Sequence, residues 1–222
     1  MTLEGFLKIV LLQTALSAIV AVVCFYKYNK RQTYIRLIGF VFLIGFLANA
    51  VAMILKPLGL NRFINVPQNI YLVTNFCLLS AVYFLVLKKR ASKLFVFVAV
   101  AFVILALLNG FYLQKSTINS YTNVIQSLVI IIYAVIYFYR LMVELPTQHI
   151  HHLPMFWFNS AFLIFHAGAF FLFAFTSYLI NVLKNDLLTY WSFHNILSII
   201  EHLIVLAGLY YDLRNPALKE SK

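Results

Sequence analysis

The feature that most constrains this chain is a series of long segments without Asp, Glu, Lys or Arg. Six of them cover residues 9–26, 37–55, 63–87, 94–114, 116–139 and 145–183, and a seventh, 187–211, is interrupted only by Glu201. Most reach the roughly 17–25 residues that a helix needs to cross a bilayer. Apolar residues make up 64% of the chain and charged residues 10%, whereas soluble domains have about 45–50% and about 25%. The chain is therefore predicted to be an integral membrane protein.

Trimming the polar ends of these segments predicts an all-α, polytopic fold, a single bundle of seven transmembrane helices over residues 1–222. The predicted helices cover residues 5–26, 36–56, 69–87, 94–113, 121–143, 155–180 and 189–211. The connections between them are short and carry the prolines, as expected for turns. No second domain is expected.

Basic residues are divided unequally between the two sides of this bundle. Twelve of the 17 Lys and Arg fall on the side of the connections 27–36 and 88–93 and of the C-terminal tail, and five fall on the other side. Because the basic side stays in the cytoplasm, the N-terminus is predicted outside and the C-terminus in the cytoplasm. The net charge of +11 then reflects orientation and contact with anionic lipid rather than nucleic-acid binding.

The last predicted helix contains the polar stretch FHNILSIIEHLIVL, residues 193–206. At about 100° per residue, His194, Glu201 and His202 fall on one arc of about 120°, which is predicted to face the bundle. A carboxylate near the bilayer centre costs about 2.5–3.5 kcal/mol, so Glu201 should have a partner. His166 on the preceding helix lies within about 5 Å of the same depth. A Glu201–His166 hydrogen bond or ion pair is predicted, with His202 as the alternative partner.

Further polar residues gather in the predicted outer half of the helices. If they face inward, they line a pocket that opens to the outside and has Glu201 and His166 at its floor. Asn159, in the inner half, lies seven residues from His166 and shares its face. The alternative is that such residues only join helices, at about 0.6 kcal/mol each. The predicted ligand or proton site comprises Glu201, His166, His202, His194, Asn195, Asn75, Gln126, Asn49, Asn109, Gln13 and Asn159.

Several function classes are disfavoured because the residues that they require are absent. Retinal is excluded because residues 189–211 contain no lysine for a Schiff base. Matched histidine pairs for two haems are missing, and the second and third predicted helices lack the His and Asp of membrane hydrolases. The histidines of HIHH, 149–152, are expected to be solvated. The sequence thus favours a non-enzymatic protein without a metal site and leaves its cofactor unknown.

The remaining classes are a receptor or sensor with a small-molecule or lipid ligand and a transporter. A receptor needs only an outward pocket and a bundle that shifts on binding, and it is the favoured prediction. A proton-linked transporter would use Glu201 and the histidines as a relay. A membrane-embedded enzyme or a haem protein stays open as a further alternative.

Two stretches, MFWFNSAFLIFHAGAFFLF (155–173) and WSFHNILSIIEHLIVLAGLYYDL (191–213), resemble the C-terminal part of the members of a family of uncharacterised bacterial seven-helix integral membrane proteins. The resemblance extends through NIYLVTNFCLLSAVYFLV and YTNVIQSLVIIIYAVIYFY. It implies a multi-pass protein of the bacterial cytoplasmic (inner) membrane and a signalling context, because genes of that family often neighbour sensor kinases. Asn75 and Gln126 stand where the family favours glutamate, and Glu201 and His202 depart from its usual last helix. A cytoplasmic or membrane signalling partner is therefore expected.

Overall fold

A computed structural model of the chain describes residues 2–56, 58–60, 65–87, 92–113, 119–144, 149–176 and 187–214. Every regular element in these ranges is helical, and all seven predicted helices are present. The part of the sixth prediction at 177–180 lies outside the described residues. The helices are α1 (Leu3–Phe25), α2 (Thr33–Leu55), α3 (Asn65–Val86), α4 (Ser92–Leu108), α5 (Ser120–Glu144), α6 (Pro154–Ala174) and α8 (Leu187–Arg214), with the short turns η1 (Tyr28–Lys30), η3 (Asn109–Leu113) and η4 (Ile150–His152).

Six of the seven helices are long and apolar enough to cross a membrane, and they make this a multi-pass membrane protein. The exception is α4, which has 17 residues and passes into the five-residue π-helical turn η3. Large apolar side chains such as Val22 and Phe97 are each 69% exposed. Exposure of this kind is costly in water and favourable in hydrocarbon, so the outer surface suits a lipid environment.

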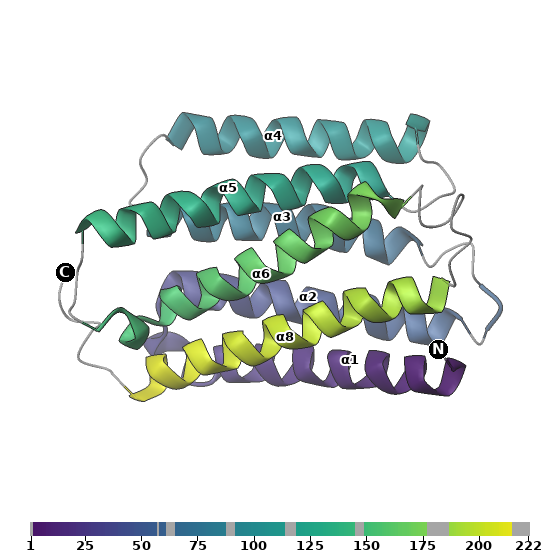
Figure 1. Ribbon diagram of the computed structural model, residues 1–222, viewed down its shortest axis with the longest axis horizontal. Helices are drawn as coiled ribbons and strands as arrows, with labels where there is room; N and C mark the ends of the chain where they lie inside the picture. The colour runs from purple at the N-terminus through teal and green to yellow at the C-terminus, as the bar shows by residue number, and fades with distance from the viewer. Residues whose placement is uncertain are drawn as a thin grey trace.

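Successive helices run in opposite directions, which gives the bundle two ends (Figure 1). The start of α1 lies at one end, called the N end here, and the last turn of α8 lies at the other, the C end. Around the bundle, α1 packs between α2 and α8, α6 between α8 and α5, and α3 between α2 and α5. These six helices form a closed ring, and α4 lies outside it against α3 and α5 (Figure 1).

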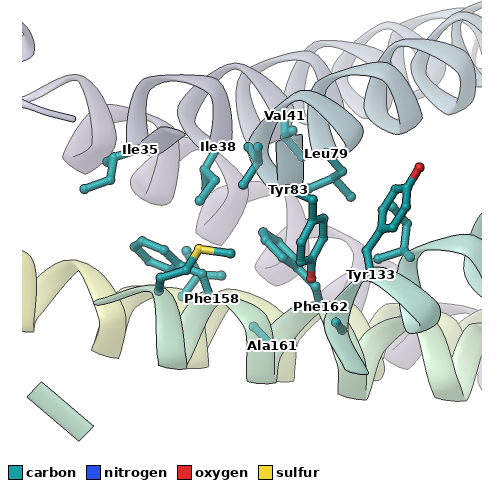
Figure 2. Close-up of a cluster of buried hydrophobic side chains, with 14 of the residues drawn as sticks. Ile35, Ile38, Val41, Leu79, Tyr83, Tyr133, Phe158, Ala161 and Phe162 are labelled. Carbon is teal, nitrogen blue, oxygen red and sulfur yellow. The ribbon is translucent and has the colours of Figure 1, made fainter. Parts of the chain in front are cut away.

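The main apolar core gathers side chains from the second half of α1, the first half of α2, the first half of α6 and the second half of α8, so it lies toward the C end. Figure 2 shows part of this cluster. Phe158 and Phe162 of α6 meet Tyr83 of α3 and Ile38 of α2, and all four side chains are fully buried. A smaller apolar cluster near the N end joins α6 to α8 through Phe173 and Tyr190.

Close packing of α6 on α8 depends on two glycines. A Cβ atom on Gly208 would lie 2.6 Å from Cε1 of Phe158, and one on Gly168 would lie 2.5 Å from Cδ1 of Leu197. Any larger residue would therefore require a neighbour to move. The two glycines fix which side of α8 faces α6, and this determines where the polar side chains of α8 point.

Candidate functional site

A row of hydrogen-bonded side chains crosses four helices of the ring. Gln68 on α3 donates to Asn49 on α2 (Nε2 to Oδ1, 3.4 Å), and Asn49 donates to Gln13 on α1 (Nδ2 to Oε1, 3.1 Å). Gln13 donates in turn to Ser198 on α8 (Nε2 to Oγ, 3.2 Å), whose hydroxyl lies 3.4 Å from Nδ1 of His202. We call these five side chains the amide row. Two of the predicted site residues, Gln13 and Asn49, thus do face inward and join helices.

The geometry of α8 places the end of this row. Ser198 and His202 are four residues apart and lie on the same face of the helix, where the His202 ring stands edge-on to Phe42 of α2 with centroids 4.8 Å apart. Nδ1 of His202 also contacts the carbonyl oxygen of Ser198, while its buried Nε2 has no hydrogen-bond partner. The amide row therefore ends at a histidine with one nitrogen unused, immediately beside Glu201.

Glu201 is 8% exposed and lies inside the bundle. Among the described residues it has no hydrogen-bond or ion-pair partner. Nδ2 of Asn75 donates to the Tyr71 hydroxyl at 2.9 Å, and Oδ1 of Asn75 stays buried without a partner. The Tyr71 ring packs closely against Gly45 of α2, because Gly45 has no Cβ atom; one built there would lie only 3.1 Å from the ring.

The predicted Glu201–His166 pair is wrong, and so is the alternative with His202. Nδ1 of His166 lies 3.4 Å from the Ser127 hydroxyl on α5, and its Nε2 has no partner. The prediction used only the depth of His166 in the membrane, and depth does not determine how α6 is rotated about its axis. Gly168 marks the side of α6 that faces α8, and two residues correspond to about 200°, so His166 points toward α5 instead.

His194 lies in an aromatic environment nearer the N end. Its ring centroid is 5.5 Å from that of Phe165, 5.7 Å from Phe173 and 5.8 Å from Trp191. His194 therefore lies between α6 and α8, separate from the amide row.

The other predicted site residues are not brought together with Glu201 by any hydrogen bond. Asn109 donates to Thr122 on α5 (2.8 Å), and α4 lies outside the ring, so Asn109 does not belong to the predicted pocket wall. Asn195 donates to the carbonyl of Trp191 in its own helix (2.8 Å).

Two more amides lie on α5 and α6. Asn159 accepts from the Tyr83 hydroxyl (2.8 Å) and donates to the carbonyl of Ala134 (3.1 Å), so it ties α6 to α3 and α5. Gln126 is buried, and its Oε1 has no partner.

A buried ion pair at the C end was not expected from the sequence. Arg31, in the connection between α1 and α2, pairs with Asp212 in the last turn of α8, and the two side chains are 1% and 2% exposed. Arg31 also donates to the carbonyls of Tyr26 (3.1 Å) and Val23 (3.0 Å) at the end of α1. The available signal was that Asp212 falls on the same arc of α8 as His194 and Glu201, but Arg31 was counted only as an orientation residue.

The histidines of the segment 149–152 stack on one another and on α8. His152 lies 4.3 Å from His151 and 5.8 Å from Tyr211, measured between ring centroids. Desolvation and the neighbouring charges of His151, His149 and Arg214 lower the pKa of His152 below its usual value. In the part of the chain that the structure describes, no group of three His, Cys, Asp or Glu side chains is arranged to hold a metal ion.

Comparisons with known proteins leave the chain without a relative from which to take a function. No protein-family model, no curated protein and no solved structure matches it.

Proposed function

We propose that this protein is a seven-span membrane receptor or sensor that binds a small ligand beside Glu201 in the interior of its helix bundle. Its N-terminus lies outside and its C-terminus in the cytoplasm of a bacterium, and the protein spans the inner membrane. A separate signalling partner reads its state from the cytoplasmic side, where the basic connections lie. The observation that carries this proposal is the burial of Glu201 without a hydrogen-bond or ion-pair partner among the described residues.

The energetic cost of Glu201 favours a ligand over a structural role. A charged carboxylate near the bilayer centre costs about 2.5–3.5 kcal/mol on insertion scales, and a buried polar group without a partner costs about 1–3 kcal/mol. Hydrogen bonds between helices offset the cost of burying the side-chain amides of Gln13 and Asn49. Glu201 joins nothing in this way, so a bound molecule is the simplest source of compensation.

The position of Glu201 on α8 suits signalling across the membrane. The amide row ends at the next residue, His202, and connects α8 to α1, α2 and α3. Toward the C end, α8 carries Asp212 eleven residues further on, about 16 Å along the axis. A ligand that rotates or shifts α8 would alter both the amide row and the Arg31–Asp212 pair, and these two features give binding a route to the cytoplasmic side.

A proton-linked transporter is the second candidate. Glu201 is the neighbour in sequence of His202, whose Nδ1 lies 3.4 Å from the Ser198 hydroxyl, and hydroxyl, imidazole and carboxyl groups are the usual members of proton relays. Such a transporter would move protons when a gradient is imposed, whereas a receptor would only bind.

The first test is native mass spectrometry with a visible absorption scan on protein purified in nanodiscs. The proposal expects a co-purifying small molecule in the wild type that is absent from Glu201→Gln, with Glu4→Gln as the control because Glu4 forms an exposed pair with Lys8. Absorption typical of haem would support the haem alternative instead. Proton uptake in proteoliposomes under an imposed gradient, lost in Glu201→Gln, would favour the transporter.

A stability measurement separates these roles from a structural one. Glu201→Leu should insert, fold and be at least as stable as the wild type while it loses ligand. A Glu201→Leu protein that fails to insert or fold would show that Glu201 serves the fold and would overturn the receptor proposal.

A further inference from the structure

We propose that the start of α2, at the C end, carries a binding site for an anionic phospholipid, with Arg36 as the contact to the lipid phosphate. The site is independent of the receptor function proposed above. A net charge of +11 by itself implies only a general attraction to anionic membranes. Three features together specify a site instead: a guanidinium held in place, a surplus of positive charge around it, and an apolar stripe that continues from it into the bilayer.

The Arg36 side chain is held on two sides. Its guanidinium carbon lies 5.0 Å from the centre of the Tyr28 ring, and its Nη2 donates to the Thr33 hydroxyl at 3.0 Å. An arginine has five N–H donors. Among the described residues only the bond to Thr33 uses one of them, and the buried Nε has no acceptor. The guanidinium is therefore oriented in advance and keeps donors on its Nη atoms for a ligand.

The carboxylates described at the C end are engaged elsewhere. Asp212 and Glu144 each pair with an arginine other than Arg36. Exposed Lys27 and Lys30, in the connection that precedes α2, add further positive charge. Because a guanidinium offers planar, paired hydrogen bonds to the oxygens of a phosphate, a phosphate group complements both the geometry and the charge of this region.

The depth of Arg36 suits the headgroup layer of a bilayer. Helix α2 has 23 residues and is about 35 Å long, slightly more than the roughly 30 Å of the hydrocarbon core. Arg36 lies in its first turn, so its charge is at the level of the lipid phosphates when α2 spans the membrane. Tyr28, against which it stacks, is of a residue type that gathers at the same level.

An exposed apolar stripe on α2 continues from Arg36 toward the bilayer centre. Phe40 and Leu47 follow it along the helix, within about 40° of Arg36 around the axis, and both are exposed. Leu47 is about 16 Å from Arg36 along the axis, which is about half of the hydrocarbon core. An acyl chain attached to a phosphate on Arg36 therefore has the length of one leaflet to lie against.

Helix α1 completes the upper part of this stripe. The Phe25 ring stands edge-on to Phe40 with centroids 5.0 Å apart, and its centroid is 6.1 Å from that of Tyr28. Phe25 comes this close because Gly39 has no Cβ atom, and one built there would lie 3.2 Å from the ring. A soluble phosphate would make no use of these aromatic side chains, so a lipid is the ligand that fits the whole surface.

The test compares two lipids with the same acyl chains. Phosphatidylglycerol has an uncompensated phosphate charge, and phosphatidylcholine carries a cation in its headgroup; glycerol phosphate is the probe for a free phosphate. Native mass spectrometry of delipidated protein in detergent, titrated with each probe, gives the Kd of the first bound molecule. The wild type should bind phosphatidylglycerol saturably and about fivefold or more tightly than phosphatidylcholine, and it should bind glycerol phosphate far more weakly.

Three variants assign the binding to Arg36, each first checked for helical content by circular dichroism. Arg36→Gln should raise the Kd for phosphatidylglycerol about tenfold, because hydrogen bonds between charged groups are the strong ones. Arg36→Lys keeps the charge but loses the planar donor set, so it should raise this Kd less. Lys56→Gln removes the same charge from an exposed residue at the other end of α2, and it should bind as the wild type does.

Each part of the proposal has an outcome that overturns it. Equal Kd values of the wild type for the two lipids would exclude a preference for an anionic headgroup and leave an acidic protein segment as the partner of this surface. Glycerol phosphate that binds as tightly as the lipid would replace the lipid by a soluble phosphate. A folded Arg36→Gln protein that binds phosphatidylglycerol as Lys56→Gln does would remove Arg36 from the site. If Arg36→Gln does not fold, an unchanged Kd in Arg36→Lys decides the same point.

Discussion

Removal of either partner of the Arg31–Asp212 pair should destabilise the protein strongly. The two side chains are 1% and 2% exposed, so Asp212→Leu leaves a guanidinium buried without its counter-charge. Breaking a buried pair in this way costs about 3–5 kcal/mol. Arg31→Met should cost about 1–2 kcal/mol more, because the carbonyls of Val23 and Tyr26 also lose their donor.

The double variant distinguishes a buried pair from two independent contributions. With both charges replaced by apolar side chains, neither Arg31 nor Asp212 is left without its counter-charge, and the two carbonyls at the end of α1 lose a bond. Arg31→Met/Asp212→Leu should therefore be within about 2 kcal/mol of the wild type. These values give a coupling energy of at least about 5 kcal/mol between the two positions, above the roughly 0.5–3 kcal/mol of ordinary contacts, because each single variant leaves a buried charge without its partner.

The assay is equilibrium unfolding by SDS titration from mild detergent micelles, followed by circular dichroism. The exposed Glu4–Lys8 pair, with side chains 78% and 73% exposed, supplies the control, because Glu4→Gln should change the free energy of unfolding by at most about 0.5 kcal/mol. The reasoning is refuted if Asp212→Leu costs no more than Glu4→Gln, or if the double variant is as unstable as the sum of the single ones.

Two further predictions concern packing and pH. Gly208→Ala places a methyl group 2.6 Å from the buried Phe158 ring and should lower the free energy of unfolding by about 1–3 kcal/mol. Gly110→Ala, with no atom within 4 Å of the added carbon, should leave this free energy unchanged or raise it slightly in the same SDS titration. Equal effects of the two substitutions would contradict the close contact between α6 and α8. Because the pKa of His152 is lowered in the folded protein, the unfolded chain binds its proton first, so stability should fall as pH drops below about 6.5. A smaller loss of Tm between neutral and acid pH in His152→Gln than in the wild type would support this, and an equal loss would rule it out.

The helices were predictable because each long apolar segment alone indicates a helix, whatever its neighbours are. The rotation of each helix about its own axis was not predictable. Depth placed Glu201 and His166 at similar levels, but the contact of Gly168 with Leu197 turns His166 toward α5. Such a contact depends on the shapes of two helices together, and no pattern within one helix reveals it.

Two other outcomes have physical causes of the same kind. The apolar sequence of α4 resembles that of the ring helices, so its place outside the ring could not be recognised, and Asn109 was assigned to the interior for that reason. Arg31 looked like one of many basic residues near a membrane surface. Its burial follows from the turn after α1, which directs the side chain back toward Asp212.

The contacts between α1 and α8 bear on how the protein is made. Gln13 and Ser198 are 185 residues apart in sequence, and Arg31 and Asp212 are 181 apart. During synthesis, α1 enters the bilayer long before either partner exists, so a buried cation and an amide must wait in lipid or in the insertion machinery until the last helix emerges. Closure of the ring therefore waits for α8, which packs against both α1 and α6. A nascent chain that stops before α8 lacks the partners of the Arg31 guanidinium and of the Gln13 amide nitrogen.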